Sequence, residues 1–435
     1  MAVTGIKIIW LTIVLAGSVY LQYRWKKTNI PEHLLDHPIR VHQDFVNEQM
    51  AEELLNMVKK VKSFPTNAND LTHLNRTYEH IGEAEPILAN GSCRSSFLIP
   101  SKDRKECVLP SRFDIAYHFM KYGGIDGLKE KYEMLATRML TFGRYIFDLD
   151  DYKIMKDVFT SPKFLKDAVE VCPPNKQVLD PFQYHLIIQI PGQTIPIHLD
   201  APYFTDASRF QYPVWLLVIM VASDLYRDNF IDQIQVVMNL HTWNSTKKGG
   251  QFAYYPKNDI RPTYVQPFPR SATIVDGAKT IHAATLYKQK NTPPILPKSA
   301  DNVLEYVGND SWTLFSNKNP LRSYKTKDLR ITVVYRARCF ESEAKKEAYK
   351  KWFTTAEKHE VRPVQEILNE LKTELSKRKN IPVSDLDGIS AVELAIMFVE
   401  EFIRYPLPGK AMIPYNYCVL DTMFPFLKQF LSFIC

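Results

Sequence analysis

Two residues of the segment QIPGQTIPIHLDAPYF (residues 189–204) have side chains that commonly bind metal ions. His198 and Asp200 are two positions apart, and side chains of a β-strand alternate between its faces, so both would point the same way. An imidazole and a carboxylate on one face are two of the three ligands in the two-histidine, one-carboxylate sites that bind ferrous iron. An ordinary strand with two polar side chains on its solvent face is the alternative. The same spacing recurs at His42 and Asp44, where a helix cap explains the aspartate better.

A site of this kind needs a second histidine from a distant strand. Residues 273–282 read TIVDGAKTIH, which predicts a strand, a glycine turn and then His282 at the start of another strand. A lone histidine in such a place is more often a hydrogen-bonded, half-buried residue than a ligand. His282 is therefore a candidate metal ligand only in combination with His198 and Asp200.

A further group of polar side chains lies on the predicted strand LRITVVYRAR, residues 329–338. Alternation puts Arg330, Thr332, Arg336 and Arg338 on one face and apolar residues on the other. If the apolar face packs on helices, up to three arginines line the interior of a sheet. Buried guanidinium groups are costly unless they meet anions, and their forked geometry suits a carboxylate. The segment predicts a dicarboxylate site, with a solvent-facing edge strand as the alternative.

The order of these motifs resembles the 2-oxoglutarate/Fe(II)-dependent dioxygenase superfamily, and its pattern is closest to the prolyl 4-hydroxylase branch. Residues 191–193 (PGQ) are similar to the turn before the first histidine in that branch, and residues 235–240 followed by 249–252 (GGQF) resemble its central strands and Gly-Gly turn. The arginine pattern also resembles that of alkylation-repair demethylases. The resemblance covers residues 181–340, and it implies an α+β fold whose core is a double-stranded β-helix, or jelly roll, with helices before and after it.

The resemblance also implies cofactors and the residues that bind them. Fe(II) and 2-oxoglutarate are the cofactors implied, O2 is the cosubstrate, and ascorbate is a further candidate. The implied metal ligands are His198, Asp200 and His282. The residues implied for 2-oxoglutarate are Arg330, Thr332 and Arg336, although the long gap between His282 and Arg330 departs from the family pattern.

The residues predicted to contact the substrate are Tyr203, Phe204 and Asn239. Tyr203 and Phe204 follow the ligand pair, where a pocket wall would lie, but bulky aromatic residues near a strand end can equally belong to the core. Gln235 and His241 share a strand face with Asn239, although a polar outer face is the better explanation for His241. Residues 205–232, which include an apolar run, depart from the family pattern and leave the substrate class open.

Three functions are compatible with these motifs. The first is a dioxygenase that hydroxylates a C–H bond of a protein or peptide side chain, as prolyl hydroxylases do. The second is a dioxygenase acting on a lipid or small metabolite, and the third is a catalytically inactive jelly-roll module that only binds a partner. A nucleic-acid partner is not expected, because the net charge of +7 is modest and no basic stripe is interleaved with aromatic residues.

The elements that must position these residues follow from the change in pattern along the chain. Helical periodicity predicts helices at residues 44–62 and 128–147, and a capping box begins at Ser390. Residues 288–328 predict a long loop or insertion. The predicted segments are residues 1–28 as a membrane anchor or signal sequence, 29–180 as a mainly helical region, 181–340 as the jelly-roll domain and 341–435 as a C-terminal helical region.

The N-terminal segment predicts a compartment. Residues 8–23 are uncharged and mostly apolar, flanked by Lys7 and by a basic cluster that begins at Arg24. As a helix they would span ~24 Å, short of a ~30 Å hydrocarbon core, so a retained anchor depends on flanking charges that snorkel. A cleaved signal peptide is the alternative. We expect a single-pass protein of the endomembrane system, with the endoplasmic reticulum as the candidate membrane.

The side of the membrane stays open. The positive-inside rule places the basic cluster in the cytoplasm. Two other features point to the lumen: the possible bridge between Cys93 and Cys107, for which free thiols are an equal alternative, and the glycosylation sequons. The sequons lie at Asn75, Asn90, Asn244 and Asn309.

Overall fold

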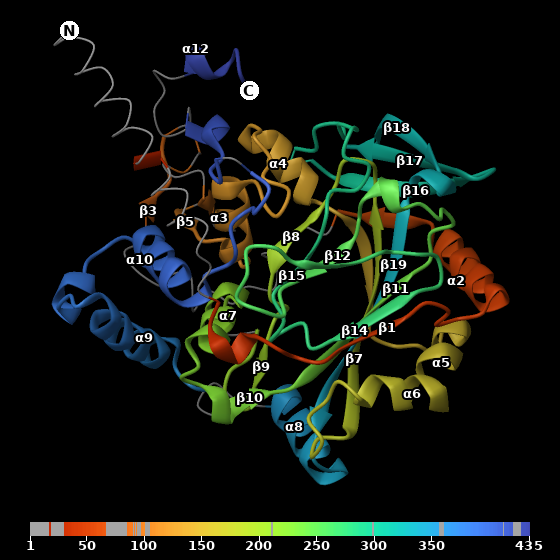
Figure 1. Ribbon diagram of the computed structural model, residues 1–435, viewed down its shortest axis with the longest axis horizontal. Coiled ribbons are helices and arrows are strands. Elements are labelled where there is room, and N and C mark those ends of the chain that lie inside the picture. The colour runs from red at the N-terminus through yellow and green to blue at the C-terminus, as the bar shows by residue number, and fades with distance from the viewer. Residues whose placement is uncertain are drawn as a thin grey trace, which may run out of the picture.

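The computed structural model describes residues 17–18, 30–66, 85–89, 91, 93, 97–100, 105–209, 212–297, 300–355, 361–411, 413–420 and 428–435. Within them the chain is a mixed α and β fold built on antiparallel sheets, with helices on both sides (Figure 1). Two sheets, one of six and one of four strands, carry the two predicted histidine ligands and the residues predicted to bind 2-oxoglutarate. This arrangement is consistent with the predicted jelly-roll core.

The larger sheet contains the strand of arginines at its centre. Its strands, in spatial order, are β1 (Ile39–His42), β14 (Ala272–Val275), β11 (Gln233–Asn239), β19 (Arg330–Phe340), β7 (Val178–Gln189) and β6 (Phe142–Ile146). β1 and β6 come from the region before residue 181, so the sheet extends into the predicted N-terminal segment.

The outer face of the larger sheet is apolar and covered by helices. Ile331 and Val333 of β19 share one hydrophobic core with α2 (Glu48–Val61), α5 (Lys153–Phe159) and α6 (Pro162–Val169), which lie together on the right in Figure 1. Each fully buried aliphatic side chain contributes roughly 1.5–3 kcal/mol. Because the apolar face turns outward, the alternate side chains of β19 must line the interior, as predicted.

The smaller sheet carries the predicted histidines. Leu199 and Ala283 belong to a second core, shared with α7 (Val214–Ser223), α9 (Val364–Lys379) and α10 (Ala391–Phe398). The strands of this sheet, in spatial order, are β13 (Thr263–Val265), β12 (Phe252–Tyr254), β15 (His282–Ala284) and β8 (Ile195–His198). β8 is an edge strand of this sheet.

The remaining described elements surround these two sheets. The helices are α3 (Phe113–Tyr122), α4 (Tyr132–Met139), α8 (Glu343–Thr355), α12 (Lys428–Leu431) and the π-helical turn η9 (Val399–Ile403). The short 3-10 turns are η1 (Glu32–Leu34), η4 (Arg227–Asn229), η5 (Thr246–Lys248), η6 (Thr326–Asp328), η8 (Val383–Leu386) and η10 (Tyr417–Val419). The small sheets are β9 (Tyr203–Phe204) with β10 (Phe230–Ile231), and β3 (Glu85–Pro86) and β4 (Ile99–Pro100) on either side of β5 (Glu106–Val108).

Two predicted helix boundaries are confirmed or corrected. The helix expected at residues 44–62 is α2, but its N-cap is Asn47, whose side chain accepts a hydrogen bond from the Met50 N–H. Asp44, expected as the cap, instead bonds to Arg270. The cap at Ser390 is confirmed, because its hydroxyl accepts the Glu393 N–H.

The long helix expected at residues 128–147 is wrong. α4 ends at Met139, and residues 142–146 form β6, which pairs along β7. The hydrogen bonds and apolar neighbours that β7 offers outweigh the helical tendency of the segment, as tertiary context often does.

The loop expected at residues 288–328 is also wrong in its second half. Residues 302–325 form three antiparallel strands, β16 (Asn302–Gly308), β17 (Ser311–Ser316) and β18 (Asn319–Lys325), which continue onto β2 (Ser63–Pro65). Tight turns at Asn309 and Asn317 connect them, with positive φ angles that asparagine tolerates well. The segment is a small sheet inserted between the second histidine and the strand of arginines.

Disulfides pair all of the cysteines. Cys93 and Cys107, for which a bridge and free thiols were equal alternatives, form a disulfide. The two that spacing did not suggest are Cys172–Cys339 and Cys418–Cys435.

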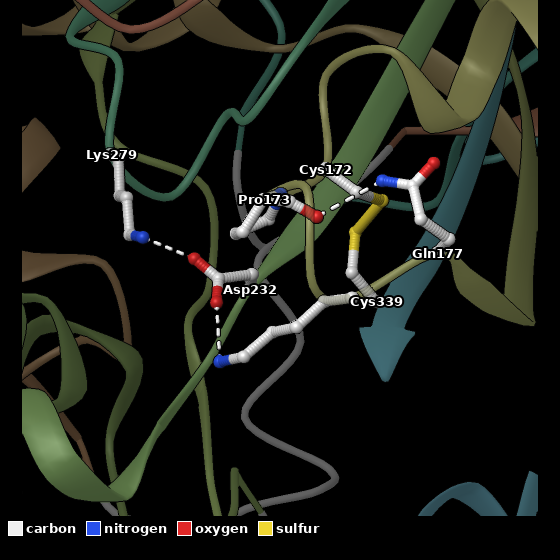
Figure 2. Close-up of a disulfide and its surroundings, with 7 residues drawn as sticks. Cys172, Pro173, Gln177, Asp232, Lys279 and Cys339 are labelled. Carbon is white, nitrogen blue, oxygen red and sulfur yellow. Dashed lines mark hydrogen bonds and ion pairs between the residues drawn. A yellow bond between two sulfur atoms is a disulfide. The ribbon is translucent and has the colours of Figure 1, made fainter. Parts of the chain in front are cut away.

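Figure 2 shows the Cys172–Cys339 bond, which ties the segment after α6 to the end of β19. The buried carboxylate of Asp232 lies beside it and accepts hydrogen bonds from Lys279 and, at 2.7 Å, from Lys176. Because Lys279 precedes the β15 strand, Asp232 links the disulfide segment to the loop that leads to the second histidine.

Replacing Cys172 and Cys339 with serine will lower the free energy of unfolding by about 4–5 kcal/mol, because this bond closes a loop with a sequence separation of 167 residues. The same change at Cys93 and Cys107, which are 14 residues apart, will cost about 3 kcal/mol. Urea denaturation of the two variants measures both losses. A larger loss from the shorter loop would contradict this account.

The predicted membrane anchor, residues 8–23, lies outside the described residues apart from positions 17 and 18. In the part of the chain that the structure describes, no helix has the length and apolar character needed to span a membrane.

Candidate functional site

The three predicted metal ligands come together between the two sheets. His198 ends β8 and lies directly opposite His282 at the start of β15, with ring centroids 4.2 Å apart. Asp200 follows β8, and its Oδ1 lies 3.7 Å from the Nε2 of His198. One ligand atom from each residue lies within 4.8 Å of the others, and all three residues are buried. Strand pairing thus brings together residues that are 82 to 84 positions apart in sequence.

Both imidazoles are oriented in the same way. The Nδ1 of His198 donates to the carbonyl of Pro196, and the Nδ1 of His282 donates to the carbonyl of Thr280, each at 2.8 Å. A carbonyl can only accept, so each Nδ1 carries a proton, and each Nε2 is the ring nitrogen left to bind a metal ion. Burial, reinforced by the neighbouring His198, lowers the pKa of His282 to about 3. This is the arrangement in which a histidine is ready to bind a metal ion.

The carboxylate of Asp200 is held in its charged form. Burial would raise its pKa, but the guanidinium of Arg336, with a bond of 2.6 Å to Oδ1, and His198 hold the pKa well below its ordinary value. Gln235 completes the contact, because its Oε1 accepts from Arg336 Nε at 2.8 Å while its Nε2 lies 3.3 Å from the Nε2 of His282. Arg336 therefore already has a carboxylate partner within the chain. Its predicted contact with 2-oxoglutarate stays a prediction.

A glycine makes room for the aspartate. Gly277 accepts the Asp200 N–H at 2.8 Å, and a Cβ at position 277 would lie 1.9 Å from Asp200 Oδ2. Only glycine fits there without displacing the carboxylate.

Changing Gly277 to alanine will therefore weaken Co(II) binding by roughly 10- to 100-fold, the range seen when the support of a metal ligand is disturbed. Titration of the metal-free protein with Co(II) measures this affinity. The circular dichroism spectrum should remain that of the unchanged protein, and undiminished affinity would show that the carboxylate tolerates the added methyl group.

Asp276, next to this glycine, gives the site a pH-dependent stability. Burial raises the pKa of its carboxyl to about 7 from an ordinary value near 3.8. Because the folded pKa is the higher one, the stabilisation is complete below pH ~4 and is lost as the pH rises through ~7, by an amount on the order of 4 kcal/mol. Replacing Asp276 with asparagine will flatten the fall in unfolding free energy between pH 4 and 7, as denaturation at each pH will measure.

Arg330 is a buried charge with no carboxylate partner among the described residues. It is 3% exposed, its Nη1 donates to the Gln189 side-chain oxygen at 2.7 Å, and its Nε has no partner. Burial lowers its pKa to about 10. Gly250, with a φ of +68°, lies against it, and a Cβ at position 250 would come within 2.8 Å of Arg330 Cδ. Leaving a guanidinium buried in this way is costly, so the position suits an anion.

The third arginine of the strand has a structural role. The Nη2 of Arg338 lies 2.6 Å from Asp180, and its guanidinium lies over the ring of Tyr203 at 5.1 Å. Tyr203 and Phe204, predicted to contact substrate, are buried in two hydrophobic cores. The alternative explanation, that they are core residues, is the one the structure supports.

The other predicted residues lie on the inner face of the larger sheet. Thr332 and Asn239 are directly opposite each other on β19 and β11, and both are buried. The Asn239 Nδ2 donates to Ser271 at 3.1 Å, while its Oδ1 has no partner. His241 is 1% exposed and stacks on Trp243, so the polar outer face expected for it is wrong.

Both donor sets fit the groups that the motifs imply. Two imidazoles and an ionised carboxylate are the ligands of a ferrous site. The unpaired guanidinium of Arg330, beside a Gln189 Nε2 that also lacks a partner, offers donors for a carboxylate. Gln189 was not predicted, although a glutamine that ends the apolar run YHLIIQ was a visible signal.

Comparisons with known proteins give only low similarity. No family model matches the chain, and no curated protein is significantly similar to it. Solved structures that match it at low similarity include a 2-oxoglutarate/Fe(II) oxygenase and two prolyl hydroxylases.

Three of these structures illustrate the range. A Pseudomonas putida prolyl 4-hydroxylase has 10% identity and a TM-score of 0.31, covering 69% of this chain and 93% of its own. A Trichoplax adhaerens prolyl hydroxylase in complex with a hypoxia-inducible factor peptide has 11% identity and a TM-score of 0.31, covering 71% and 86%. A Burkholderia pseudomallei oxidoreductase of the 2OG-Fe(II) oxygenase family has 10% identity and a TM-score of 0.27, covering 46% and 68%. At such TM-scores function must be inferred from the site itself.

Proposed function

We propose that this chain is an Fe(II)- and 2-oxoglutarate-dependent dioxygenase that hydroxylates a C–H bond of a protein or peptide side chain. The observation that carries the proposal is a buried cluster of His198, Asp200 and His282 at the smaller sheet, together with a buried arginine of the larger sheet, Arg330, that has no carboxylate partner among the described residues. The first feature suits ferrous iron and the second suits the far carboxylate of a keto diacid.

Each residue of the site has a defined task in this proposal. The two histidines offer their Nε2 atoms, and Asp200 supplies a carboxylate that Arg336 keeps ionised. Arg330 binds the distal carboxylate of 2-oxoglutarate. Bound in this site, Fe(II) with 2-oxoglutarate and O2 supplies the oxidation that hydroxylates the substrate and releases succinate and CO2.

A protein or peptide substrate is favoured over a lipid for one structural reason. The lipid alternative depended on the apolar run within residues 205–232 lying at the pocket mouth. Those residues form α7, whose side chains from Trp215 to Ser223 are buried in the core. The apolar run is thus explained by packing. The substrate class itself is proposed from the motif resemblance to prolyl hydroxylases.

The proposed location is the lumenal side of an endomembrane, with the N-terminal segment as anchor. Disulfides persist in oxidising compartments, and three occur here. The sequon asparagines Asn244 and Asn309 are exposed, as glycosylation requires. Protease protection of the protein in microsomes tests the orientation, and digestion of the chain in intact vesicles would argue for the cytoplasmic side.

The test of the enzymatic proposal is succinate formation by the purified full-length protein with Fe(II), 2-oxoglutarate and O2. Turnover without substrate is expected at a low rate, and it will be absent from His198→Ala. His42→Ala is the matched control, because it alters the second histidine-x-aspartate motif outside the site. Equal background from all three proteins would favour the inactive binding module. A mass gain of one oxygen on candidate peptides or lipids then separates the substrate classes.

A further inference from the structure

The main chain of Leu199, the residue between the two ligands of β8, is held on both sides by buried side chains. Its N–H donates to the hydroxyl of Tyr405 at 3.0 Å. Its carbonyl accepts from Arg112 Nη2 at 2.8 Å. These two contacts come from residues 87 and 206 positions away along the chain.

The two side chains belong to one closed network. Arg112 forms two hydrogen bonds with the carboxylate of Asp114, at 3.0 and 2.8 Å. The hydroxyl of Tyr405 donates to the same carboxylate at 2.9 Å. Arg112, Asp114 and Tyr405 are 9%, 0% and 7% exposed, so the whole network is removed from water.

The position of Leu199 explains why such a network matters. Leu199 directly follows β8, an edge strand whose outer side pairs with no other strand in the described part of the chain. A buried main chain cannot leave its polar groups unpaired. The Leu199 side chain is buried in the outer core, and alternation turns His198 and Asp200 to the interior. Fixing both polar groups of this one residue therefore limits the rotation of the two ligands beside it.

A buried ion pair is an expensive way to satisfy two main-chain groups. Desolvating a guanidinium and a carboxylate costs several kcal/mol per ion, and apolar residues of similar volume often stabilise a core equally well. The network is thus poorly explained by stability alone. The network also fixes an orientation, because hydrogen bonds to the Arg112 guanidinium and the Tyr405 hydroxyl hold the main chain of Leu199 at a defined angle.

We propose that Arg112, Asp114 and Tyr405 are positioning residues for the metal site, which hold the ligand pair of β8 at the spacing that the ion requires. The inference rests on the proposed metal-binding function. It connects that site to the start of α3 and to the C-terminal segment after η9, neither of which supplies a metal ligand among the described residues.

The test replaces Tyr405 with phenylalanine in the full-length protein, which keeps the ring and removes the hydroxyl. Tyr226→Phe is the matched control, because Tyr226 is equally buried in the same core and its hydroxyl bonds to Glu370 at 2.9 Å, away from the ligand segment. The metal-free proteins are titrated with Co(II), and the visible absorption of bound Co(II) and the thermal midpoint of each metal-free variant are recorded.

We expect Tyr405→Phe to lose 10- to 100-fold in Co(II) affinity and to shift the Co(II) absorption bands, as loss of a ligand's supporting contacts does. Tyr226→Phe should lower the thermal midpoint by a similar amount and leave the affinity and spectrum unchanged. If Tyr405→Phe does not fold, Asp114→Asn is measured in its place, with the same loss expected.

The two ways of failing are distinct. If the unchanged protein binds Co(II) and Tyr405→Phe binds it as tightly as Tyr226→Phe, the positioning role is wrong and the metal site stands. If the unchanged protein binds no Co(II), both the metal site and the positioning role are wrong.

Discussion

Asp200→Ala will reduce succinate formation by at least about a thousandfold and will prevent Co(II) binding at micromolar concentrations. The carboxylate is the only negatively charged member of the ligand cluster, so its loss leaves only the two imidazoles. A metal ion contributes several kcal/mol of catalysis, and each 1.4 kcal/mol corresponds to a factor of ten in rate. Succinate release and Co(II) titration measure the two effects.

The second motif of the same spacing supplies the control. Asp44→Ala removes the aspartate of His42-Gln43-Asp44, which bonds to Arg270 on the surface. It will leave succinate formation and Co(II) binding unchanged. Asp200→Ala also leaves Arg336 without its carboxylate. Replacing Arg336 with methionine as well should recover stability without recovering activity. Recovery of activity in that double variant would show that the carboxylate serves only as a counter-ion.

The features that the sequence predicted best depend on the alternation of apolar and polar side chains along a short segment. The alternation of β19 identified which side chains face inward, because a strand buried on one face must turn its apolar residues to that side. The same logic placed His198 and Asp200 on a common face. These predictions required only a short window of residues and the knowledge that one face is covered.

Features that depend on distant partners were missed. Residues 142–146 form a strand because β7 lies beside them, and residues 302–325 form a sheet that ends on β2, more than 200 positions earlier. The residues of each segment do not show which distant strand will pair with it. The Cys172–Cys339 bond was missed for the same reason, since its two residues meet only after the larger sheet has formed.

The roles of individual charged residues were the hardest to predict. Three arginines of β19 face inward, yet Arg336 and Arg338 have carboxylate partners within the chain, at Asp200 and Asp180. Only the folded structure shows that Arg330 has none among the described residues. The sequence narrowed the search for a carboxylate-binding arginine to one strand, and the ion pairs then distinguished its members.

That distinction leads to opposite expectations for two arginines of the same strand. Arg330→Met will weaken 2-oxoglutarate binding on the order of a hundredfold or more, since truncating one partner of a buried charge pair costs roughly 2–5 kcal/mol. The ligand-free protein will keep its stability to within about 1 kcal/mol, because the lost hydrogen bond to Gln189 is offset by no longer burying an unpaired charge.

Arg338→Met will lower the stability of the protein and leave its affinity for 2-oxoglutarate unchanged, although Arg338 is buried to a similar extent, at 5% exposed against 3% for Arg330. Its removal leaves the buried carboxylate of Asp180 without its ion-pair partner and will lower the free energy of unfolding by roughly 3–5 kcal/mol. The affinity of the folded fraction for 2-oxoglutarate should not change. Denaturation and calorimetric titration of both variants measure the two quantities. If Arg330→Met destabilised the ligand-free protein as much as Arg338→Met does, Arg330 would be a structural residue, and the carboxylate-binding site would have to lie elsewhere.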